Sequence, residues 1–107
     1  MKRLYSEQFY KPDIEAARAA LDAHIDYKGG NEPTSRSLKE KFSVQPKDGQ
    51  WPARLLLDAD EITAILNGIA IMDATEKVRL HGPNGSPGEK FRMLEDMLRR
   101  EIGERGR

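Results

Sequence analysis

Residues 59–79 form the segment that most constrains how this chain can fold. Large apolar residues recur along one side of a helix in this segment: Ile62, Ile65, Leu66, Ile69 and Met72. Ala64, Gly68 and Ile71 lie on the far side, where a solvent-facing helix would carry charges. Glycine inside a helix costs about 1 kcal/mol relative to alanine, and close approach of another helix is the usual gain. We therefore predict a central helix packed on two sides, with one side facing a partner subunit.

Acidic residues stand at the start of this helix, in the sequence Asp-Ala-Asp-Glu. Asp58 or Asp60 is expected to cap the helix, and Glu61 adds negative charge to its first turn. The same two aspartates could hold a divalent cation only with further oxygen ligands from elsewhere. We favour the cap, and we expect no metal site and no cofactor.

Two further segments show helical spacing. Residues 12–28 begin with Pro12, which suits a first turn, and they are followed by Gly29 and Gly30, which stop a helix. The apolar stripe of this helix consists of Ile14, Ala17, Leu21 and Ile25. A second side carries only small residues: Ala16, Ala20 and Ala23. His24 lies beside the apolar stripe and is interpreted as a histidine at the core edge or on the surface.

Residues 87–102 make the last predicted helix. Its core stripe is Phe91, Leu94, Leu98 and Ile102. Met93 and Met97 widen the apolar face to one side, as adaptable methionines do at binding surfaces. Glu95 and Arg99 are spaced to form an ion pair on the outer surface. Gly103 is expected to end the helix and to leave residues 103–107 as a frayed tail.

The regions between the helices are polar and rich in turn residues. Residues 29–36 are predicted to be a linker, and the sequence SLKEKF after it suits a short helix. Within residues 42–57, Pro-Lys-Asp-Gly favours a turn, and its flanks FSV and ARLLL could pair as a short β-hairpin. Trp51 is expected to cover one end of the core from this region.

The glycine-rich stretch 80–91, LHGPNGSPGEKF, raises the question of phosphate binding. Its glycine spacing fits neither the dinucleotide fingerprint nor the P-loop, and only four residues match the GxxG of KH RNA-binding domains. Gly82 instead suits a helix end, and Ser86 with Glu89 makes a capping box for the next helix. The stretch is therefore interpreted as the bend of an αα-hairpin.

Composition limits the functional classes. The 107 residues suit a single domain, residues 1–107, with 18 basic and 18 acidic side chains and therefore no net charge. That balance disfavours non-specific nucleic-acid binding, which needs a basic surplus. Cysteine is absent. The start of the chain lacks the pattern of a signal peptide, and no apolar run approaches the roughly 20 residues of a membrane span. We expect a cytoplasmic protein.

These patterns predict a mainly α domain of three long helices that acts as a non-catalytic protein–protein interaction protein. It would bind its own copy, as a homo-oligomer, or a larger protein, and its size suits the accessory or inhibitory proteins of phages and mobile elements. Five residues are candidates for the partner interface: Ala64, Gly68, Ile71, Met93 and Met97. The alternative is binding of a nucleic acid or nucleotide through Arg79, His81 and Lys90. A third possibility is an enzyme that uses Asp58, Asp60 and a metal, although no catalytic constellation is visible.

Overall fold

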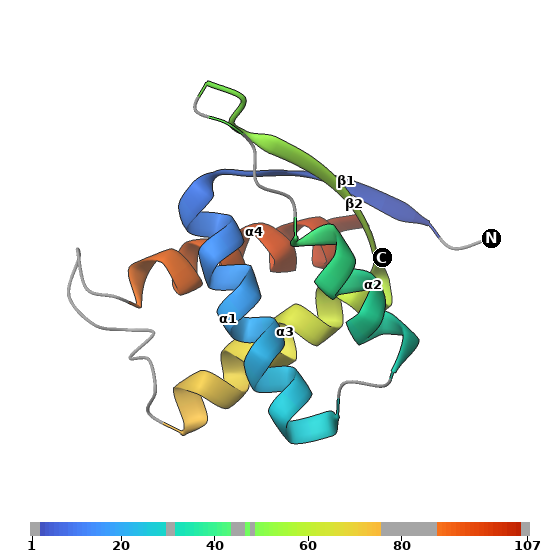
Figure 1. The fold of residues 1–107 in the computed structure, drawn as a ribbon, viewed down its shortest axis with the longest axis vertical. Helices are drawn as coiled ribbons and strands as arrows, with labels where there is room; N and C mark the ends of the chain where they lie inside the picture. The colour runs from blue at the N-terminus through green and yellow to red at the C-terminus, as the bar shows by residue number, and fades with distance from the viewer. Residues whose placement is uncertain (1–2, 30–31, 44–46, 48, 76–87, 106–107) are drawn as a thin grey trace.

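The computed structural model describes residues 3–29, 32–43, 47, 49–75 and 88–105. The fold is mainly α, as predicted, with a small two-stranded sheet beside the helices (Figure 1). The elements in chain order are β1 (Leu4–Phe9), α1 (Lys11–Lys28), α2 (Pro33–Lys41), β2 (Ala53–Asp58), α3 (Ala59–Ala74) and α4 (Glu89–Arg105).

The strand predicted from ARLLL exists, but its predicted partner is wrong. β2 pairs antiparallel with β1, so that Tyr5 lies opposite Leu57 and Phe9 opposite Ala53. Phe42, where the predicted hairpin was to begin, instead follows the last residue of α2. A turn does form after Phe42, where the amide of Gln50 donates a hydrogen bond to the carbonyl of Lys47 at 2.9 Å. This turn leads the chain into β2, whereas the pairing partner comes from the start of the chain.

One face of the two-stranded sheet is buried. Along β1 the inward residues alternate with exposed ones, and Tyr5, Glu7 and Phe9 point toward the helices. Phe9 is fully buried and its ring lies 5.8 Å from that of Phe42, centroid to centroid. The sheet therefore adds an aromatic contact to the helical core.

α1 and α3 cross at the centre of the molecule (Figure 1). Both predicted sides of α1 are buried, since Ala16 and Ala20 are as inaccessible as Ala17. Gly68 of α3 lies directly against the backbone of Ala20, where a Cβ atom would collide with the carbonyl oxygen. The close helix approach predicted for Gly68 is thus made to another helix of the same chain.

The predicted linker over residues 29–36 is too long. α2 begins at Pro33, which occupies the first turn, and it ends at Lys41. Ser35 and Leu38 are buried on its inner side. A stretch rich in Pro, Thr and Ser reads as a linker by composition, but the same residues are favoured at a helix start.

The start of α3 is tied to α2 and β2 by the buried carboxylate of Glu61. Asp58 caps the helix, as predicted, by accepting a hydrogen bond from the amide of Glu61 at 2.8 Å. One Glu61 oxygen accepts from the Asp58 amide at 3.0 Å and from the Lys41 ammonium at 2.7 Å, and the other accepts from the Ser37 hydroxyl at 3.0 Å. Lys41 also donates to the carbonyl of Leu56 at 2.7 Å. Glu61 therefore joins three elements rather than only charging a first turn.

α4 packs against both α1 and α3. Phe91, Leu94 and Leu98 are buried as predicted, and the Glu95–Arg99 ion pair is present at 3.6 Å. Gly103 does not end the helix, because α4 continues to Arg105. Residues 76–87 lie outside the described residues. They include Ser86 of the predicted capping box, most of the glycine-rich stretch and residues 76–79 of the predicted central helix.

Trp51 is half-buried against the core, as expected from the sequence. Among the described residues, no helix combines the length and the apolar character that crossing a bilayer requires.

Candidate functional site

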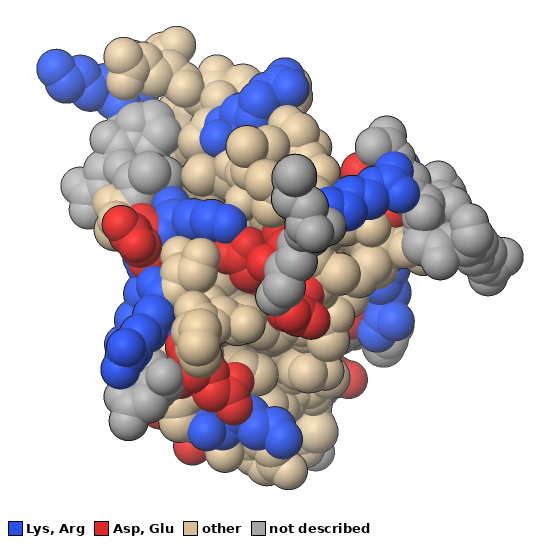
Figure 2. Space-filling model, turned by 90° about the vertical axis from the view of Figure 1, so that its right-hand side faces the viewer, with Lys and Arg blue, Asp and Glu red and all other residues tan. Residues whose placement is uncertain are grey.

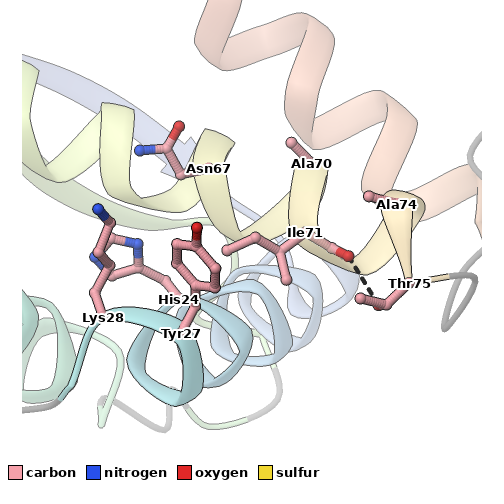
Figure 3. Close-up of a pocket in the computed structure, with 8 residues that line it drawn as sticks. All are labelled: His24, Tyr27, Lys28, Asn67, Ala70, Ile71, Ala74 and Thr75. Carbon is pink, nitrogen blue, oxygen red and sulfur yellow. Dashed lines mark hydrogen bonds between the residues drawn. The ribbon is translucent and has the colours of Figure 1, made fainter.

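A groove of about 530 Å³ opens between the C-terminal halves of α1 and α3. Its volume lies within the range of roughly 300–1,000 Å³ typical of ligand sites. Figure 3 shows the residues of α1 on one side of it and those of α3 on the other. The lining residues are His24, Tyr27, Lys28, Asn67, Ala70, Ile71, Ala74 and Thr75.

The apolar part of the groove is formed mainly by α3. Ala70, Ile71 and Ala74 lie three and four residues apart and therefore share one side of the helix, together with the polar Asn67. Ala70 and Ala74 are exposed and Ile71 is half-buried. Across the groove, Tyr27 of α1 leaves 70% of its surface accessible. An exposed aromatic side chain beside a small-residue helix side is a favourable site for a partner to bury apolar surface.

The ionisable side chains of the groove come from α1. His24 is only 5% exposed, and its Nδ1 atom is buried without a hydrogen-bond partner in the described part of the chain. Its Nε2 atom lies 4.0 Å from a carboxylate oxygen of Glu32. Lys28 is exposed, with its ammonium 5.4 Å from the centre of the Tyr27 ring. A cation and a buried imidazole therefore stand next to the apolar surface.

The groove includes one of the predicted interface residues on α3 and excludes the other two. Ile71 lines it, whereas Ala64 and Gly68 are buried. The α1 helix occupies the position against Gly68 where the sequence pattern predicts a partner subunit. Small residues on a helix indicate close packing but do not say whether the neighbour comes from the same chain.

The methionines of α4 lie at a second, separate hollow of about 440 Å³. Met93 is 61% exposed and Met97 is half-buried. Glu7 of β1 and the charged side chains of α4 complete the lining: Asp96, Arg100 and Glu101. The hollow is more polar than the groove, and its charged rim is mostly acidic.

The basic residues of the nucleic-acid alternative are only partly placed. Lys90 lies 3.6 Å from a carboxylate oxygen of Glu15, so its charge is already balanced. Arg79 and His81 lie outside the described residues. On the face shown in Figure 2, the Lys and Arg side chains are interspersed with Asp and Glu. A mixed surface of this kind does not provide the continuous basic track that phosphate contacts need.

Both aspartates of the metal alternative lie at the start of α3. Asp58 accepts the amide hydrogen bond of the cap, and Asp60 lies in the first turn of the helix. Across the described ranges, no three His, Cys, Asp or Glu side chains are grouped so that they could hold a metal ion.

Comparison of the chain with protein-family models, with curated proteins and with solved structures gives no match. The sequence patterns do not identify most of the residues that line the groove: Tyr27, Lys28, Asn67, Ala70, Ala74 and Thr75. A usable signal was present, because Ala70 and Ala74 extend the small apolar side of the predicted central helix toward its C-terminus.

Proposed function

We propose that this chain is a non-catalytic interaction protein that binds a partner protein through the groove between α1 and α3. The observation that carries the proposal is the exposed apolar lining of that groove, with Tyr27 at its rim. Tyr27 is the most exposed large apolar side chain in the described part of the chain. Tyrosine is enriched among the residues that dominate binding energies, because it buries a large rigid surface at low entropic cost.

The shape of the groove favours a macromolecular partner. Ala70, Ala74 and Tyr27 are all exposed, so the groove is an open trough on the surface rather than an enclosed chamber. A small ligand would leave much of its own surface in water there, whereas sites for small ligands usually bury most of the ligand. A protein segment laid along the trough would cover both walls at once.

Site-specific photo-crosslinking in the native cell tests the proposal. A benzophenone amino acid replaces Tyr27 in one variant and Tyr10 in another. Tyr10 is a suitable control because it is also an exposed tyrosine, 54% accessible, but lies between β1 and α1, outside the groove lining. We expect a discrete protein adduct from position 27 that is absent from position 10. Adducts of equal pattern at both positions, or no adduct at position 27, would overturn the proposal.

The captured protein is then purified and its affinity for the chain is measured by calorimetry. Ala74→Arg places a long charged side chain in the groove and is expected to weaken binding by about tenfold or more. Gln8→Arg on the exposed face of β1 is the control and should leave the affinity unchanged. If the adduct is a second copy of the chain, sedimentation velocity replaces calorimetry and identifies the partner as the chain itself.

A further inference from the structure

Two polar side chains of the groove, Lys28 and His24, indicate which chemical group its occupant presents. Lys28 has no carboxylate partner among the described residues, and its ammonium lies near the Tyr27 ring. A lysine at the end of α1 is favoured by the helix dipole, but that alone leaves its charge available to a ligand. The groove therefore offers one cation on its α1 side.

His24 gives the second, independent observation. Its side chain is more than nine-tenths buried, yet Nδ1 meets no hydrogen-bond partner in the described part of the chain. Leaving a buried polar atom unsatisfied costs about 1–3 kcal/mol, so such an atom in a native structure calls for an explanation. His24 lines the groove on one side and a neighbouring hollow, which also contains Glu32, on the other. The carboxylate of Glu32 thus lies on the Nε2 side of the ring, and the buried Nδ1 has no partner among the described residues.

Figure 3 shows the imidazole beside the side chains of Lys28 and Tyr27, with Asn67 across the groove on α3. A carboxylate is the group that suits this end, because it accepts hydrogen bonds from both an ammonium and an imidazole N–H. The α3 side of the groove adds Ile71 between two exposed alanines. Small residues at a spacing of four let the backbone of an incoming helix approach closely, and Ile71 offers a contact for an apolar anchor.

The carboxylate is better supplied by a side chain than by a chain end. Capture of a C-terminal carboxylate generally uses free backbone N–H groups. Here α1 ends at Lys28 and α3 at Ala74, so the groove lies near two helix C-termini, which present carbonyl oxygens instead. A carboxylate bound there must therefore take its hydrogen bonds from side chains such as Lys28.

We propose that the occupant of the groove is an amphipathic helix of the partner protein that sets an apolar side chain on Ile71 and an acidic side chain between Lys28 and His24. This inference rests on the proposed function, because it assumes that the groove binds protein. It adds the chemistry of the bound segment: an apolar residue that contacts Ile71, and an aspartate or glutamate that lies near Lys28 and His24.

Two synthetic helical peptides test this recognition. Each is alanine-based, about 15 residues long so that it can be helical alone, and carries two leucines four positions apart. One peptide has a glutamate a turn beyond the leucines, and its twin has glutamine there. Each is titrated into the full ¹⁵N-labelled chain, and amide chemical shifts give both the site and the dissociation constant.

We expect both peptides to shift the resonances of Tyr27, Ile71 and Ala74. The glutamate peptide should bind about fivefold tighter than its twin, because its carboxylate forms a partly exposed charged hydrogen bond with Lys28. Lys28→Gln should bring this ratio close to one. Lys11→Gln, at the opposite and exposed end of α1, is the matched control and should preserve it.

The outcomes separate this inference from the proposed function. Equal binding of the two peptides to the unmodified chain would overturn carboxylate recognition while leaving an apolar protein-binding groove intact. Shifts confined to Met93 and Met97, or no shifts at all, would overturn the helical occupant. The crosslinking at Tyr27 would then still decide independently whether the groove binds protein.

Discussion

The backbone carbonyl of Ala20 on α1 occupies the space that a side chain on Gly68 of α3 would need. Gly68 is buried in the middle of a helix, where glycine is unfavourable by about 1 kcal/mol relative to alanine. The crossing of the two central helices therefore depends on the absence of one methyl group.

Gly68→Ala is expected to destabilise the fold by about 2–3 kcal/mol despite the better helix propensity of alanine, because the obstructing atoms are backbone and cannot rotate away. Urea denaturation followed by circular dichroism measures this change. Gly103→Ala is the matched control, since a Cβ there meets nothing within 4 Å. It should leave stability unchanged or raise it by up to about 1 kcal/mol. A Gly68→Ala protein as stable as the original would show that the helices can separate slightly at no cost.

Glu61 is only 2% exposed, and its charge is balanced by Lys41 at 2.7 Å. Glu61→Gln keeps the size of the side chain but removes the charge, and it turns one acceptor into a donor facing an ammonium or a hydroxyl. We expect a loss of about 2–3 kcal/mol, as for other buried charged hydrogen bonds. The loss is measured as a lower urea concentration at the midpoint of unfolding, with an unchanged dependence of the unfolding free energy on urea. Glu40→Gln on the exposed side of α2 is the control and should change stability by less than about 0.5 kcal/mol. A similar effect at both positions would contradict a special role for the Glu61 carboxylate.

Local patterns predicted the helices and one of the two strands but not the strand that pairs with it, for physical reasons that particular residues illustrate. The stripes of α1, α3 and α4 repeat over several turns, so each is a strong signal within one segment. β1 has only six residues, and its middle inward position is Glu7, which breaks the apolar alternation expected of a strand. Its pairing with β2 joins residues about fifty positions apart, and no turn chemistry fixes such a register.

The candidate groove was predictable only in part, because it depends on how two helices cross. Ile71 was identified from its position on the central helix, but Tyr27 and Lys28 lie on another helix and enter the site only through the α1–α3 contact. Gly68, one of the two residues that meet at this contact, is predicted from its sequence position to allow close approach, and Ala20 lies on the small-residue side of α1. Neither the α1 segment nor the α3 segment alone indicates which helix packs against it.

The role of β1 in the fold can be tested at Phe9, which is fully buried and contacts the ring of Phe42. Phe9→Ala removes this contact and leaves a cavity, so we expect a loss of about 3–4 kcal/mol. Gln8→Ala, one residue earlier on the exposed face, should cost less than about 0.5 kcal/mol. Thermal and urea denaturation measure the unfolding free energy of both variants. If Phe9→Ala were as mild as its neighbour, the first strand would not belong to the cooperative core.

His24 allows a prediction in which stability and binding change in opposite directions. Its buried Nδ1 lacks a partner in the described part of the chain, so an apolar side chain of similar size removes an unsatisfied group. His24→Leu is therefore expected to raise the unfolding free energy of the unbound chain by about 0.5–1 kcal/mol. The same variant should weaken binding of the glutamate peptide toward the level of its glutamine twin. A loss of stability would instead show that the imidazole is satisfied within the fold.

Ser35 separates this effect from a general gain on removing buried polar atoms. Its hydroxyl is also buried without a hydrogen-bond partner among the described residues, but it is not part of the groove. Ser35→Ala should raise stability by about 0.5 kcal/mol, helped by the higher helix propensity of alanine. It should leave the affinity for both peptides unchanged. Stabilisation by both variants, with weaker peptide binding only for His24→Leu, would identify His24 as a polar group kept unpaired in the free protein for its ligand.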